Sequence, residues 1–238
     1  MNKFSPLMKP TLAVAALLLT SASALALTDG PYSASFPASG TQNFPLNSTL
    51  TLPKFNVSGG TLTSVSITLF GSMTATQRGE NLDSAPATLQ ITTQGTITLK
   101  RPDNSTLVIT QPQLINSANL AAFDGNADFA GVSGITFTPV VTTKSDTSAF
   151  TSSTDLALFT GAGTIALPVV GSGISFGEGP SNLTVNAGLV GFTTASVTYT
   201  YSTAAPVPEA STYGSIGAVT VAGFLGYRRA RRKAVQTA

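Results

Sequence analysis

The chain has 238 residues, of which 12 are basic and 10 acidic, giving a formal charge of +2. It contains no His, no Cys and no Trp. The absence of His and Cys excludes Ser-His-Asp and Cys-His catalytic arrangements, His-based metal sites and disulfide bonds. Any catalytic or metal site would have to be built from carboxylates, amides and hydroxyls.

The N-terminal segment, residues 1–26, has the three parts of a secretory signal peptide. Two lysines precede an apolar run at residues 12–19, and small residues follow that run. The Ala-x-Ala sequences that end at Ala24 and Ala26 predict cleavage after one of these two residues. The run is too short and wrongly flanked for a lasting anchor, so we expect a signal helix that is removed on export.

The charge of the chain is unevenly distributed. Residues 27–205 hold five basic residues against nine carboxylates, a formal charge of −4. The positive charge of the whole chain therefore comes from its two ends, and it does not indicate a nucleic-acid partner. Only 9% of the residues are charged. Thr, Ser, Gly and Asn are left to form the surface, which is typical of an exported β-protein.

The body, residues 27–202, is predicted to be all-β. Apolar and polar residues alternate with a period of two, β-branched residues are frequent, and no stretch has a convincing helical period. The pattern predicts an antiparallel β-sandwich, with a barrel as the alternative. Residues 116–134 are the least strand-like, and 102–105 form a turn. Strands are expected at 46–52, 62–70, 89–92, 96–99, 106–110, 135–141, 156–159, 164–167 and 195–201.

Three carboxylates are the candidates for enzymatic chemistry. Glu80 and Asp83 lie in a loop-like sequence, and Glu178 lies in a Gly-Pro turn. A pair of carboxylates could in principle hydrolyse a glycosidic bond. Carboxylates are common in surface loops, however, and no Trp is present to form a sugar platform. We therefore expect no catalytic residues and no enzyme.

The spacing Asp124-x-Asn126-x-Asp128 resembles the first half of a calcium loop. The sixth place of such a loop needs Gly and the twelfth needs Glu, whereas this chain has Phe129 and Ile135 there. Turns in which Asp or Asn side chains bond the backbone are the simpler interpretation. These three residues are weak metal candidates only, and no cofactor is expected.

The last thirty or so residues combine a short motif, an apolar run and a basic cluster. A stiff linker at residues 203–208 leads into Val207-Pro208-Glu209-Ala210-Ser211, and the stretch from Gly214 to Tyr227 carries no charge. These 14 residues cover about 21 Å as a helix, which is short for a bilayer, so we expect a short transmembrane helix over residues 212–227. The basic tail, residues 228–233, should hold its end in the cytoplasm. It consists of Arg228, Arg229, Arg231, Arg232 and Lys233.

Residues 207–234 resemble the PEP-CTERM sorting signal of Gram-negative bacteria. The resemblance rests on Val207, Pro208, Glu209, Ser211, Tyr213-Gly214, the Gly-rich apolar span and Tyr227-Arg228-Arg229. Ala210 stands where the fullest form of the motif has a second Pro. The resemblance implies a substrate of exosortase, an integral-membrane enzyme. It also implies a cut close to Pro208-Glu209 outside the membrane.

The body is similar to the bacterial choice-of-anchor surface domains, most closely to the type-E domain. That family is named for its variable C-terminal anchors and has no established catalytic residues. The similarity covers most of the body and is carried by residues 52–56, 60–62, 65–69, 129–134, 155–164 and 197–201.

Together these features predict an exported, non-enzymatic protein of the cell surface or extracellular matrix. Signal peptidase and exosortase are the expected processing partners, and the inner membrane is a transient one. The resemblance to proteins of exopolysaccharide-producing bacteria implies a role in a biofilm matrix and exopolysaccharide as a partner. The alternative is a carbohydrate- or calcium-dependent binding module, and an enzyme comes third.

Overall fold

The computed structural model describes residues 25–203, 222–225 and 228–229. Residues 26–203 form one compact unit. The signal segment up to Ala24, the sorting motif, and most of the predicted membrane helix and basic tail lie outside the described residues. Residues 222–225 and 228–229 are helical. Among the residues that the structure describes, no helix has the length and apolar character needed to cross a bilayer.

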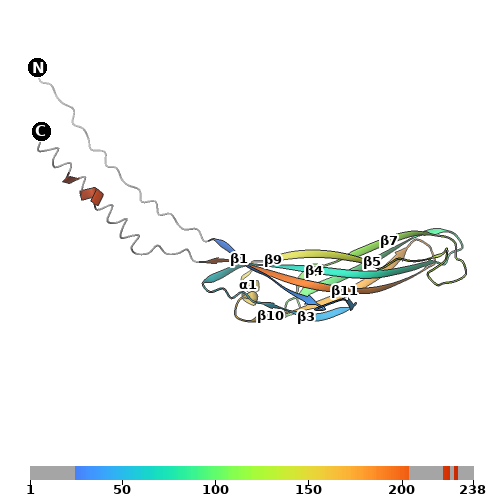
Figure 1. Cartoon of the computed structure of the whole chain (residues 1–238), viewed down its shortest axis with the longest axis horizontal. Coiled ribbons are helices and arrows are strands. Elements are labelled where there is room, and N and C mark those ends of the chain that lie inside the picture. The colour runs from blue at the N-terminus through green and yellow to red at the C-terminus, as the bar shows by residue number, and fades with distance from the viewer. Residues whose placement is uncertain (1–24, 204–221, 226–227, 230–238) are drawn as a thin grey trace, which may run out of the picture. The chain divides into compact units, whose positions relative to one another are not determined.

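The compact unit consists of two antiparallel sheets, and within residues 25–203 neither sheet closes on itself. This confirms the all-β prediction and fits the sandwich rather than the barrel. We call the two sheets sheet A and sheet B (Figure 1). In sheet A the central strands β11 (Leu183–Thr203) and β4 (Gly60–Asn81) pair with each other. The strands β1 (Ala26–Phe36) and β2 (Gln42–Asn43) pair with β11, and β8 (Gly134–Thr136) and β9 (Val140–Phe150) pair with β4. Sheet B has the order β3 (Leu46–Pro53), β10 (Thr164–Glu178), β5 (Ala87–Lys100), then β6 (Thr106–Thr110) and β7 (Gln113–Leu120).

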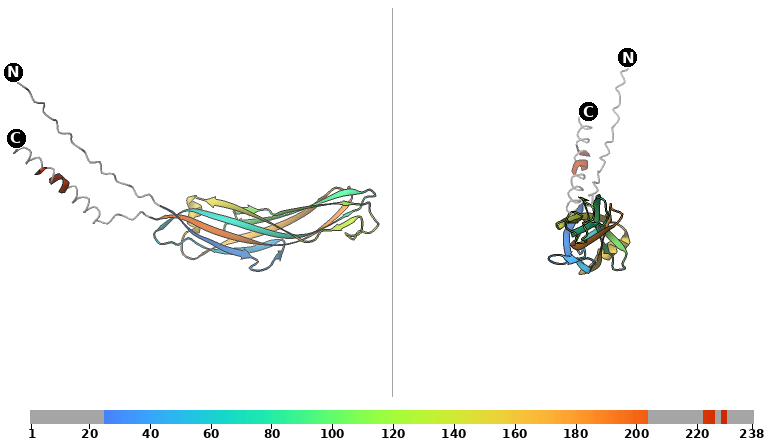
Figure 2. Two further views of the ribbon diagram at one scale, coloured as in Figure 1. Left: turned by 45° about the horizontal axis from the view of Figure 1, so that its top comes forward. Right: turned by 90° about the vertical axis from the view of Figure 1, so that its right-hand side faces the viewer.

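The longest strands, β4 and β11, pair with each other over their whole length. Leu183 lies opposite Asn81 at one end, and Thr203 lies opposite Gly60 at the other. At about 3.3 Å per residue, such a strand spans about 70 Å. Figure 2 shows that the strands of both sheets run along this same general direction. Thr203, which the sequence placed in the linker, is the last residue of β11.

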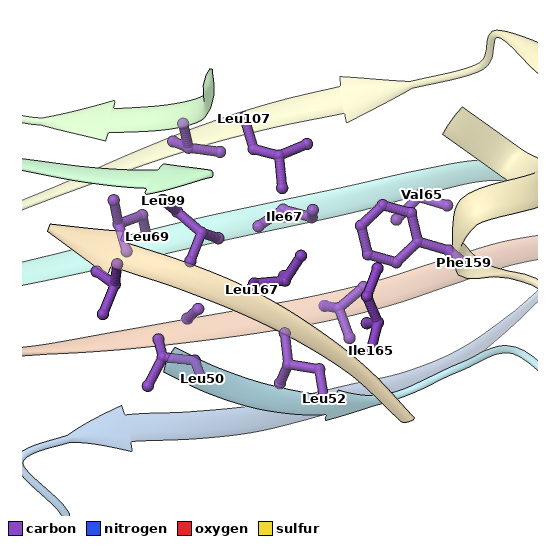
Figure 3. Close-up of a cluster of buried hydrophobic side chains, with 14 of the residues drawn as sticks. Leu50, Leu52, Val65, Ile67, Leu69, Leu99, Leu107, Phe159, Ile165 and Leu167 are labelled. Atoms are coloured by element: carbon purple, nitrogen blue, oxygen red, sulfur yellow. The ribbon is translucent and has the colours of Figure 1, made fainter. Parts of the chain in front are cut away.

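The hydrophobic core fills the half of the sandwich between β3, β10, β5 and β4. The alternate residues Val65, Ile67 and Leu69 of β4 point inward and are fully buried. Figure 3 shows them facing side chains from β3 and β10, among them Leu167, which is also fully buried. Burying one such side chain contributes about 1.5–3 kcal/mol, so the period-two pattern is the main source of stability here.

An aromatic cluster closes the core at the end that contains residue 203. Phe55 and Tyr199 have ring centroids 5.8 Å apart, and the Tyr199 hydroxyl donates a hydrogen bond of 2.5 Å to the carbonyl of Pro53. Burial, and after it the negative charge of Asp29, raise the pKa of Tyr199 above its ordinary value. The hydroxyl is therefore held in its protonated, donating form.

The predicted strand at residues 156–159 is wrong, because this segment belongs to helix α1 (Ser153–Phe159). Ser152 caps the helix by accepting the backbone N–H of Asp155, and its own hydroxyl donates to the Asp155 carboxylate at 2.8 Å. Phe159, at the last position, is fully buried in the core. The Ser-x-x-Asp spacing is a capping signal, so the sequence did carry a mark of this helix.

Arg101 connects the helix to the hairpin between β5 and β6. Its guanidinium forms an ion pair of 2.8 Å with Asp155 and lies 5.3 Å from the ring centre of Phe150. It also donates a hydrogen bond of 2.8 Å to the carbonyl of Thr106. Arg101 thereby contacts α1 through Asp155, β9 through Phe150 and β6 through Thr106.

Two other predicted segments need correction. The strand expected at 135–141 is divided into β8 and β9, which pair with different parts of β4. Pro139 lies in the break, and proline has no N–H for a strand ladder. Residues 116–120, expected to be unlike a strand, belong to β7. In this strand Ala118 and Leu120 point inward as expected, but the polar Asn116 also points inward and the apolar Ile115 points outward, which interrupts the usual pattern.

The outer face of sheet A is built from hydroxyls. Ser33, Ser196, Thr68 and Thr147 form one row across β1, β11, β4 and β9. The Ser33 and Ser196 hydroxyls are 2.6 Å apart, and those of Thr68 and Thr147 are 2.8 Å apart. Cross-strand hydroxyl pairs of this kind stabilise a sheet modestly while giving it a neutral, wettable surface.

Replacing Phe159 with Ala should lower the free energy of unfolding by about 3–5 kcal/mol, because it removes a fully buried aromatic ring and leaves a cavity. Urea unfolding followed by circular dichroism measures this. Val132→Ala is the matched control, since Val132 is exposed and its truncation should cost no more than about 0.5 kcal/mol. Equal stability of the two variants would show that α1 is not part of the core.

Candidate functional site

The residues predicted to direct sorting are mostly outside the described part of the chain. This holds for Ala24, the motif at residues 207–211, and three of the five basic-tail residues. Ala26 is the first residue of β1. Arg228 and Arg229 are helical, and the Arg228 guanidinium lies 5.8 Å from the ring centre of Phe224. The cleavage sites and the sorting motif therefore stay predictions from sequence.

Glu80 is a fully buried carboxylate near the end of β4. One oxygen accepts the backbone N–H of Phe129 at 2.6 Å, and the other accepts the Ser133 hydroxyl at 2.6 Å. Among the described residues the ion pairs are Arg101–Asp155 and Lys144–Asp146, and Glu80 belongs to neither. The cost of burying this carboxylate is therefore offset by hydrogen bonds from the loop at residues 121–133.

The backbone of this loop is shaped to reach Glu80. Phe129 adopts a left-handed conformation with φ 59°, which is rare for a bulky residue. Gly134 lies so close to Ala130 and to the Glu80 carboxylate that any Cβ there would collide with both. The loop is thus folded over Glu80 by specific contacts, and the carboxylate is covered.

Asn81 and Asp83 hold the neighbouring loops in the same way. The Asn81 amide donates to the carbonyls of Ala85 at 2.9 Å and Ala121 at 2.7 Å, and its oxygen accepts the N–H of Asp83. The Asp83 carboxylate accepts the N–H of Ser181 at 2.7 Å. Both side chains have their polar atoms committed to backbone groups, which is a structural role.

The candidate calcium residues form the turns that the simpler interpretation predicted. The Asp124 carboxylate accepts the N–H of Asn126 at 3.0 Å, and the Asp128 carboxylate accepts the N–H of Ala130 at 2.9 Å. Within the described residues, no group of three or more acidic, His or Cys side chains is placed to hold a metal ion.

The three carboxylates considered for glycoside hydrolysis differ in exposure, and Asp83 is bonded to the backbone N–H of Ser181. Glu80 is buried on sheet A beneath the loop, whereas Glu178 is exposed at the end of β10 in sheet B. A buried acid with both oxygens occupied cannot reach a sugar substrate. The geometry therefore gives no support to paired-carboxylate catalysis.

Beyond the main core, the half of the sandwich that contains Gln77 holds a smaller hydrophobic cluster around Leu89, Ile91 and Leu120. A buried polar network lies beside it. The buried Gln77 amide of β4 donates to the Thr93 hydroxyl of β5 at 2.8 Å and accepts from the Asn116 amide of β7 at 2.8 Å. The Thr93 hydroxyl is in turn 2.7 Å from that of Ser175 in β10. One glutamine of sheet A is thereby linked to three strands of sheet B.

The outer face of sheet B shows the reverse, with apolar residues in solvent. Phe176 of β10, Thr92 of β5 and Ile115 of β7 form one row. Phe176 is 44% exposed and Ile115 is 52% exposed. Ile174, in the next row, is 59% exposed. Thr92 also faces outward but is only 6% exposed, because its two row neighbours flank it. This face was not predicted from the sequence, although the reversed alternation in the second half of β10 was its signal.

A shallow hollow lies on the same outer face, between β3, β10 and β5. Its volume is about 320 Å³. A second hollow of about 410 Å³ lies near the turn after β1 and includes Phe192. The first hollow is lined by Pro45, Leu46, Asn47, Thr96, Thr98, Val170, Gly171 and Ser172, none of which is charged.

Comparisons with known proteins give little further information. No protein-family model matches the sequence, and no curated protein matches it. A solved structure of infectious bursal disease virus, Gx strain, is 14% identical over 87% of this chain and 47% of the viral chain, with a TM-score of 0.13. That of the T13 particle of this virus is 16% identical over 88% and 46%, with a TM-score of 0.15. The chain spans about half the length of these viral chains, and scores this low carry no argument about fold or function.

Replacing Glu80 with Gln should lower the free energy of unfolding by about 1.5–3 kcal/mol, because two charge-assisted hydrogen bonds to the loop are weakened. Amide hydrogen exchange in residues 121–133 should also become faster, since the loop is tied down at Glu80.

Glu178→Gln is the matched control for this experiment, because Glu178 is an exposed carboxylate. It should change stability by no more than about 0.5 kcal/mol. If Glu80→Gln leaves both the stability and the exchange of the loop unchanged, Glu80 is not the anchor of the loop.

Proposed function

We propose that this chain is an exported, non-enzymatic protein of the cell surface or extracellular matrix, sorted and cut at its C-terminus by an exosortase. The observation that carries the proposal is the order of three features at the end of the sequence. The motif at residues 207–211 is followed by a short apolar run and then by five basic residues. The predicted signal peptide at residues 1–26 supplies the matching export step.

The physical properties of the tail support a transient membrane stage. An uncharged stretch of 14 residues is shorter than the roughly 20 that a bilayer core requires. A short span is held at a cost in bilayer thinning, so the basic cluster becomes important for its position. Basic flanks stay on the cytoplasmic side, which leaves the motif outside, where a sorting enzyme of the inner membrane would cut it.

The organisation of the body supports a cut that leaves the fold intact. The last strand, β11, ends at Thr203, and the motif begins at Val207. Cleavage near Pro208-Glu209 therefore removes no strand from the compact unit at residues 26–203. The released body would keep its formal charge of −4, while the five positive charges of the tail would stay behind.

A structural role also agrees with the chemistry of the body. Glu80 and Asp83 are committed to backbone groups, and the outer face of sheet A carries paired hydroxyls. A surface with few charged groups and many hydroxyls suits a component of a hydrated matrix. Exopolysaccharide is the partner that we propose for it.

The intact mass of the exported protein should show that the tail is lost and that the chain ends between residues 205 and 208. The cut leaves the motif's Glu209 and the basic tail with the membrane. Mass spectrometry of protein from the culture medium or the cell surface measures the new end, along with any attached group. Finding Ala238 on the exported form would refute the proposed processing.

Replacing all five basic-tail residues with Gln should weaken membrane retention and processing, because the charges that fix the orientation of the short span are gone. The β-fold should be unchanged, since the compact unit ends at Thr203. Cell fractionation and circular dichroism test the two halves of this statement.

The matched control replaces three body lysines, Lys54, Lys100 and Lys144, with Gln and should be processed normally. Normal processing of the tail variant would show that the basic cluster is not the determinant. Loss of its β-signal would contradict the separation of the tail from the folded body.

A further inference from the structure

Composition alone does not explain the exposed apolar row on sheet B, because the first half of β10 follows the usual inside-outside pattern. In its first half, β10 points Ile165, Leu167 and Val169 into the core. In its second half it points Gly173, Ser175 and Gly177 inward and leaves Ile174 and Phe176 in solvent. A reversal of the inside-outside pattern is a fault in a purely structural sheet and is expected at a functional surface.

Amide side chains surround this row. Gln94 lies opposite Ile174, and Gln113 lies opposite Gln94 on the next strand. Gln90 takes the corresponding place in the row on the other side of Phe176, opposite Glu178. An amide both donates and accepts hydrogen bonds and carries no charge. The rows of Phe176 and Ile174 contain no charged residue. Glu178 lies in the next row, on the far side of Phe176 from Ile174.

The hollow of about 320 Å³ continues this surface. Ser172 and Thr96, which line it, form the row next to Ile174 and Gln94. The lining adds two threonine hydroxyls and the Asn47 amide, again without charge. From Val170 to Glu178 the face extends about 27 Å along β10 at about 3.3 Å per residue, and neighbouring strands are about 4.8 Å apart. The surface is therefore long, neutral and shallow.

The chemistry of this surface decides between possible occupants. A charged ligand would find no opposite charge in its central rows. A second copy of the chain would need about 800 Å² from each partner for a stable interface, and much of the core of that area should be apolar. The exposed apolar side chains of this face, Phe176, Ile174, Ile115 and Ile109, are separated by threonines and glutamines and do not supply it. A sugar ring has an apolar C–H face and a rim of hydroxyls, and it matches both parts of this surface.

We propose that the outer face of sheet B binds a neutral polysaccharide. The C–H faces of its sugar rings pack on Phe176, Ile174 and Ile115. The amides of Gln90, Gln94 and Gln113 bond its hydroxyls, and the chain continues into the neighbouring hollow. The proposal gives the class of partner, a neutral polysaccharide, for the proposed matrix protein. It rests on the proposed function only for the place where binding would occur.

The test uses the full chain, purified in mild detergent from a host that lacks a sorting enzyme. Binding is measured by titration calorimetry and affinity electrophoresis with three soluble polymers: a neutral β-glucan, a neutral galactomannan and anionic alginate. At least one neutral polymer should bind, with an affinity that does not change between low and high salt, because no ion pair is involved.

The variants locate the site. Phe176→Ala and Gln94→Ala should each weaken binding by about tenfold, through loss of aromatic contact and of hydrogen bonds respectively. Ile115→Thr should weaken it by less, and Phe176→Tyr should keep it, because the ring is retained. All three positions face solvent, so folding should be preserved. Val141→Thr is the matched control, since Val141 is an equally exposed apolar residue on sheet A, and it should bind as the unchanged chain does.

Several results would overturn the proposal. They are failure of both neutral polymers to bind, binding of alginate alone with loss at high salt, and equal weakening by Val141→Thr. Self-association that Phe176→Ala abolishes would identify a second copy as the occupant instead. Failure of the sorting function would look different, because the exported protein would keep its tail while the unprocessed chain still bound the polymer.

Discussion

The continuous pairing of β4 with β11 is the constraint on which the rest of the fold depends. It runs from Gly60 and Thr203 at one end to Asn81 and Leu183 at the other. Every other strand of sheet A pairs with one of these two. A chain with no Cys and few charges cannot rely on disulfides or ion-pair networks, so backbone pairing over about 70 Å has to keep the sheet in register.

Such long strands have to cross two different interiors. In the first, leucine and isoleucine side chains interdigitate, and burial of apolar surface provides the stability. In the second, the sheets are joined by Gln77, whose amide is bonded to Thr93 and Asn116. Buried polar groups stabilise only when every partner is in place. That half therefore combines matched hydrogen bonds with a smaller buried cluster around Leu89, Ile91 and Leu120.

The sequence predicted strands where apolar residues alternate inward, and it did not predict β1, most of whose residues are exposed. Strand prediction rests on apolar residues pointing inward, which holds for Val65 to Leu69 and for Leu46 to Leu52. It fails in the second half of β10, where Gly173, Ser175 and Gly177 point inward and Ile174 and Phe176 outward. The helix α1 was missed because Leu156 and Leu158 alternate like a strand, although Ser152 and Asp155 carried the cap. The loop contacts of Glu80 join residues 49 positions apart and leave no local signal.

The outer faces of the two sheets also reflect the low content of charged residues, which is 9% of the chain. Sheet A presents rows of paired hydroxyls, and sheet B presents amides beside an apolar row. The hydroxyls and amides of these faces are hydrated as the hydroxyls of a polysaccharide are. Because few charged residues lie on these faces, salt has little effect on the interactions they make. Five basic residues lie together in the tail. Under the proposed function, their charge keeps that end of the chain on the cytoplasmic side of the membrane. Under the proposed function, the charge of the tail sets where the protein goes, and the uncharged surface of sheet B sets what it binds there.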